Sequence, residues 1–83
     1  MRELNNILES GGIPGLREEK VLIWTEAKRI LGLSSSEIKD TDLDLARRIY
    51  VVVKRYNSFD RAFNTYNGEM QDCERDLKNK FNL

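Results

Sequence analysis

The strongest candidate for metal chemistry is the stretch Asp40-Thr41-Asp42-Leu43-Asp44, which places aspartates at positions 1, 3 and 5 of a calcium-binding loop. Such carboxylates are the ligands that Ca²⁺ takes in proteins. The match ends there, because Leu45 stands at the position of the turn glycine and Val51 at that of the bidentate glutamate. We interpret the aspartates as helix caps, and we predict no metal site and no cofactor.

Residues for acid–base or nucleophilic chemistry are scarce. The sequence contains no histidine, which excludes a histidine-based triad, a Cys-His pair and any histidine-containing metal site. Its one cysteine, Cys73, falls on the apolar face of a predicted helix, where burial makes a thiol unreactive. The segment Gly11–Gly15 lacks the Lys-Ser/Thr ending of a phosphate-binding loop. We therefore expect no catalytic residues, no small-molecule substrate and no enzymatic activity.

Charge and cysteine content limit the remaining classes. Fourteen basic residues balance fourteen acidic ones, so no net field attracts nucleic acid or anionic lipid. One cysteine cannot form an internal disulfide, which favours a reducing compartment. The first ten residues lack the apolar core of a signal peptide, and no run approaches the ~20 apolar residues that span a bilayer. We expect a cytoplasmic protein without a membrane partner.

The elements that carry these residues are predicted to be helices of one domain, residues 1–83. A short helix over 2–10 offers Leu4, Ile7 and Leu8 as a docking face, and residues 11–15 form a glycine-rich hinge after it. A single core of this size supplies only about 3–5 kcal/mol of stability. A bound partner or a second copy of the chain would therefore add stability.

The second predicted helix is Leu16–Leu31, with Ile23, Trp24 and Ala27 on its apolar face. Gly32 is the expected left-handed residue of a Schellman motif at its end. Ser34 and Glu37 form a capping-box pattern, which predicts a short helix after it.

The central helix is predicted at about 41–56, within the stretch Asp40–Asn57. Leu45, Ile49 and Val52 lie on one line, and the apolar arc covers roughly half of the circumference, so neighbours should contact the helix on two or three sides. Asn57 and Ser58 predict a helix end and a new cap. We expect an all-α fold, a single bundle of four to five helices around this central helix.

The last third of the chain predicts two helices, at about 58–66 and 69–80, joined by Asn67-Gly68. Their spacing resembles the helix-turn-helix of LysR-type bacterial regulators, and this resemblance implies DNA binding. It rests on Ser58, Phe59, Ala62, Phe63, Tyr66, Cys73 and Leu77. The second helix carries more acidic than basic residues, however, and phosphates would repel it. A DNA-binding regulator therefore stays the alternative.

Interaction with another protein, or with a second copy, is the favoured function. Val51 falls on the side of the central helix away from its apolar arc, in a ridge of four basic residues that Asp44 shares. Leu22 falls among charged residues of the second helix. The alternative for Leu22 is that the N-terminal helix covers it. We expect a small regulatory, adaptor or inhibitor protein whose partner-binding residues are Leu22, Arg47, Arg48, Val51, Lys54 and Arg55.

Overall fold

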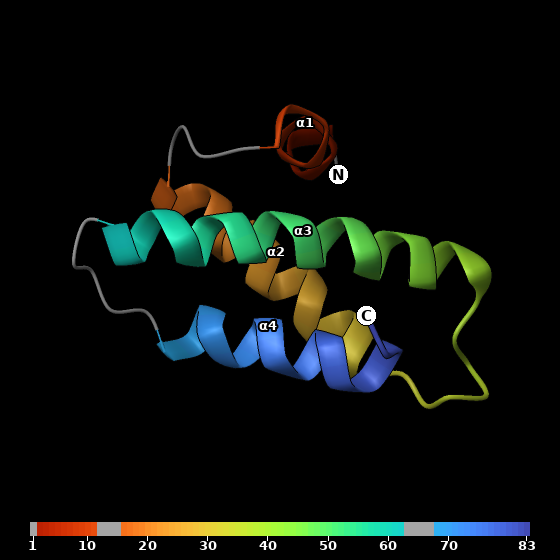
Figure 1. Cartoon of the computed structure of the whole chain (residues 1–83). Coiled ribbons are helices and arrows are strands. Elements are labelled where there is room, and N and C mark those ends of the chain that lie inside the picture. The colour runs from red at the N-terminus through yellow and green to blue at the C-terminus, as the bar shows by residue number, and fades with distance from the viewer. Residues whose placement is uncertain (1, 12–15, 63–67) are drawn as a thin grey trace.

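The computed structural model describes residues 2–11, 16–62 and 68–83. This part of the chain is helical and contains no strand, as Figure 1 shows. Its Cα radius of gyration, 12.2 Å, matches the value of about 12 Å expected for a compact chain of this length. The helices are α1 (Arg2–Ser10), α2 (Leu16–Leu31), α3 (Asp40–Ala62) and α4 (Gly68–Phe81). No described helix combines the length and apolar character needed to cross a membrane.

Helix α3 contacts the other three helices, as α2 also does. It runs the length of the molecule, with α4 antiparallel to it on one side and α1 crossing it steeply on the other (Figure 1). The apolar arc of α3 is buried because three helices cover it. The buried apolar residues of α3 recur at helical spacing, three or four residues apart: Ala46, Ile49, Val52, Val53 and Tyr56.

The predicted break at Asn57 and Ser58 is wrong, because α3 continues to Ala62. The Asn57 side chain is buried, and its Nδ2 donates to the Met70 carbonyl at 3.1 Å and to Glu74 Oε1 at 2.9 Å. Ser58 Oγ donates to the Lys54 carbonyl at 3.1 Å within the same helix. Asn57 therefore bonds across to α4 and the exposed Ser58 bonds back within α3, and neither caps a helix end. The predicted helix over 58–66 is part of α3 as far as residue 62, and residues 63–66 lie outside the described residues.

The capping-box pattern forms a turn rather than the expected short helix. The Glu37 carboxylate accepts bonds from the Ser34 backbone N–H at 3.0 Å and from Ser34 Oγ at 2.8 Å. The Glu37 N–H donates to the Ser34 carbonyl at 3.0 Å, which closes one turn. Helix α3 then begins beyond Lys39, whose carbonyl accepts from the N–H groups of Asp42 and Leu43.

The Schellman motif lies at the end of α4, not of α2. Gly32 does not adopt a left-handed backbone, and its N–H simply continues the helix by donating to the Lys28 carbonyl at 3.0 Å. The carbonyls of Leu31 and Leu33 instead accept from Lys80 Nζ of α4. At the end of α4, Asn82 has a φ of 56°, and the Leu83 N–H donates to the Lys78 carbonyl at 3.1 Å.

Helix α1 packs against both α2 and α3. Leu4 is buried in the core, and Ile7 and Leu8 pack at its edge. The helix ends at Ser10. Gly11 follows it with a φ of 69°, a conformation that glycine adopts without a steric penalty. The rest of the predicted hinge, residues 12–15, lies outside the described residues.

Candidate interaction surface on helix α3

Five of the six predicted partner-binding residues lie together on one side of α3. We call this set, Arg47, Arg48, Val51, Lys54 and Arg55, the outer ridge. Its members are spaced by three, four and seven residues, so they share one helix face. Val51, in the middle, is 55% exposed. Three of the cations are exposed and Arg48 is half-buried.

The sixth residue, Leu22, is less exposed than the sequence predicts. It is half-buried and packs against the hydrophobic core. The exposed large apolar residue among the described side chains of α2 is its neighbour Val21, at 60%. The sequence therefore predicted the exposed apolar position of α2 one residue too late, which corresponds to a rotation of about 100° around the helix axis.

The four cations of the outer ridge form no close ion pair within the described part of the chain. The Lys54 ammonium lies 5.9 Å from the Tyr50 ring centroid, which is a weak contact. By contrast, Arg29 of α2 pairs with Glu26 at 3.1 Å, and Arg75 of α4 is also paired. The ridge is therefore a local cationic patch on a chain whose net charge is zero.

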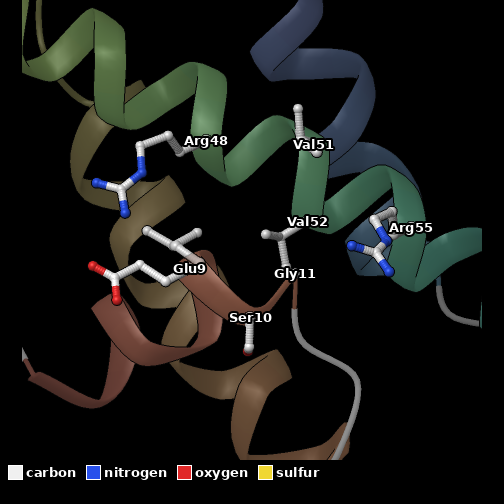
Figure 2. Close-up of a pocket in the computed structure, with 8 residues that line it drawn as sticks. Glu9, Ser10, Gly11, Arg48, Val51, Val52 and Arg55 are labelled. Carbon is white, nitrogen blue, oxygen red and sulfur yellow. The ribbon is translucent and has the colours of Figure 1, made fainter.

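A cavity of about 350 Å³ lies beside the ridge, between α3 and the end of α1 (Figure 2). Arg48 and Arg55 extend from α3 toward the two ends of the cavity, and Val52 lies between them. Helix α1 contributes the opposite wall. The lining residues are Leu8, Glu9, Ser10, Gly11, Arg48, Val51, Val52 and Arg55.

Gly11 is the residue that lets Arg55 lie against the end of α1. The Arg55 guanidinium occupies the position that a Cβ at Gly11 would need. Any larger residue at position 11 would displace Arg55. The left-handed backbone would also strain that larger residue. A cation at the C-terminal end of α1 also interacts favourably with the helix dipole.

Sequence reasoning missed a buried carboxylate on α2. Glu19 is only 3% exposed, and its Oε2 has no hydrogen-bond partner. Desolvation therefore raises the pKa of Glu19 above the ordinary value of 4.5. Glu26 is also buried, but it accepts a bond from Arg29 Nε at 3.1 Å. The signal was in the sequence, because both acids lie three or four residues from Ile23, on the apolar face.

The described residues do not assemble a metal site or a reactive thiol. No group of three or more cysteine, aspartate and glutamate side chains among them could hold a metal ion. Cys73 is buried, and this burial raises the pKa of its thiol to about 12, with the charges of Asp76 and Glu74 adding to the effect. A thiol with that pKa carries almost no thiolate at neutral pH.

No protein-family model, curated protein or solved structure matches this chain. We therefore infer the function from the geometry and charge of the surface itself.

Proposed function

We propose that this is a small non-enzymatic regulatory, adaptor or inhibitor protein that binds another protein through the outer ridge of α3. The observation that supports this function is an exposed Val51 surrounded by four cations without ion-pair partners in the described residues. An apolar centre with a charged rim is the usual anatomy of a protein interface. Arginine, in addition, is enriched at the residues that dominate binding energy.

We propose that the four described helices form a bundle with α3 at its centre. In that arrangement the core holds α3 rigidly, and the ridge is presented without reorganisation on binding. The lone buried cysteine suits a reducing compartment, and we propose the cytoplasm. Self-association through the same ridge would bring like charges together, so a different protein is the favoured partner.

Nucleic acid is the alternative partner. The observation in its favour is the four ridge cations, which form no ion pair with the described residues. The predicted helix-turn-helix supports it less. Its first helix is not separate, because residues 58–62 continue α3. On α4, Arg75 lies 3.4 Å from Asp72 and 3.5 Å from Asp76, so neighbouring carboxylates compensate its charge.

The test is affinity capture from a lysate of the source cell with wild-type protein and two variants. Val51→Asp places a charge at the centre of the ridge, and Val21→Asp makes the same change at the other exposed valine. Circular dichroism and thermal melts establish that both variants fold. We expect one defined protein to survive nuclease and moderate salt, to bind Val21→Asp normally and to be lost from Val51→Asp. Equal capture by both variants refutes the proposed surface, and loss after nuclease favours nucleic acid.

A further inference from the structure

Arg48 and Arg55 are separated by seven residues, which is one heptad of a helix. At 1.5 Å per residue they lie about 10 Å apart along α3. Val51 and Val52 fall between them, and the cavity between α1 and α3 lies beside all four residues (Figure 2). The surface therefore alternates cation, apolar residue and cation over two helical turns.

The charge at this cavity is unbalanced. Its lining contains two guanidinium groups and one carboxylate, that of the exposed Glu9. Neither arginine forms an ion pair with any described residue. Guanidinium groups bind carboxylates with two parallel hydrogen bonds, and this geometry makes them selective for acidic groups.

We propose that the occupant is an acidic helical segment of the partner protein, and this inference rests on the proposed function. Two carboxylates one heptad apart on that segment pair with Arg48 and Arg55. An apolar side chain midway between them covers Val51 and enters the cavity above Val52. A helix lying along α3 has the same rise per residue, so the acidic and apolar groups keep register with the ridge.

Helix α1 is part of this site. Its residues from Leu8 to Gly11 form one wall of the cavity, and Gly11 gives Arg55 the room to lie at the end of that wall. The segment therefore contacts two helices that are far apart in the sequence, and the cavity exists only while α1 is packed against α3.

The probe is a yeast-displayed library of 20-residue amphipathic helices with randomised polar positions, selected for binding to the full chain. Enriched peptides are synthesised, and their affinities are measured by fluorescence anisotropy in low and moderate salt. The test variant is Arg48→Gln with Arg55→Gln, and Val51→Asp reports whether a peptide requires Val51. The matched control is Arg75→Gln with Lys78→Gln, which removes two cations from α4. A 20-base-pair DNA duplex serves as the competing class of ligand.

We expect the enriched peptides to carry two acidic residues seven positions apart with an apolar residue between them. The test variant should bind them roughly tenfold more weakly, and the control variant should bind them normally. Higher salt should weaken binding by wild type. Exchanging the charges, with Arg48→Glu and Arg55→Glu against a peptide carrying lysines, should restore binding.

Three results would overturn the inference. If the enriched peptides lack the acidic pair but still require Val51, the partner chemistry is wrong and the proposed surface stands. If no enriched peptide depends on Val51, or none is enriched, the proposed surface fails as well. If the duplex binds through the two arginines and no acidic peptide does, the ridge is a nucleic-acid surface.

Discussion

Lys80 connects the end of α4 to the end of α2, and its removal should destabilise the fold. Its ammonium donates to the carbonyls of Leu31 and Leu33, which a helix end leaves without intrahelical partners. A hydrogen bond to a charged group is worth about 1.5–3 kcal/mol, and Lys80 is half-buried, so water replaces part of the lost contact. We therefore expect Lys80→Met to cost about 2 kcal/mol in unfolding free energy. For a chain of this size that lowers Tm by roughly 8–16 °C.

The assay is urea denaturation followed by circular dichroism, together with thermal melts. Lys78→Met is the matched control, because Lys78 is exposed in the same last turn of α4 and forms no ion pair among the described residues. Its effect should stay within about 0.5 kcal/mol. Equal unfolding free energies for the two variants would show that the Lys80 contacts do not hold the ends of α2 and α4 together.

Two further predictions concern buried titratable groups. Glu19→Gln removes a buried charge and should raise Tm by a few degrees at pH 7. Because the pKa of Glu19 is raised in the native state, native wild type binds a proton at this carboxylate at a higher pH than the unfolded chain does. As pH falls toward 4.5, this proton uptake stabilises wild type, and the difference in Tm between wild type and Glu19→Gln should shrink. A Tm difference that does not change with pH would contradict the assignment. Cys73, with a pKa of about 12 against an ordinary 9.0, should react with a disulfide reagent at pH 8 about three orders of magnitude more slowly in the native protein than in denaturant. Rapid native labelling would show that the thiol is accessible.

Periodicity predicted the parts of the fold that depend on local pattern. The Leu16–Leu31 helix and the buried arc of α3 follow from apolar residues recurring at helical spacing, and both are present. Asn57 shows the limit of this reasoning. An asparagine favours a helix end in isolation, but here its Nδ2 group donates to Met70 and Glu74 of another helix. A tertiary bond of this kind leaves no local signal.

The prediction of helix ends from the sequence is wrong for the same reason. Gly32 is a suitable left-handed residue, yet the carbonyls at the end of α2 are satisfied by Lys80, about fifty residues later in the sequence. On the candidate surface, the exposure of Val51 could be read from its position opposite the apolar arc. The orientation of α2 could not be fixed to one residue, because Glu19 and Glu26 interrupt its stripe on the buried side.

The cavity beside the ridge is the feature that the sequence predicts least, because it depends on where α1 packs. Arg48 and Arg55 alone describe an exposed cationic face, which would suit phosphate as well as carboxylate. With α1 in place, the same two side chains flank a partly apolar hollow with Val52 between them. Phosphodiester backbones gain nothing from such a hollow, whereas an acidic helix fills it with an apolar side chain. We therefore propose that the packing of the nine-residue helix α1 makes this cationic surface favour a protein partner over nucleic acid.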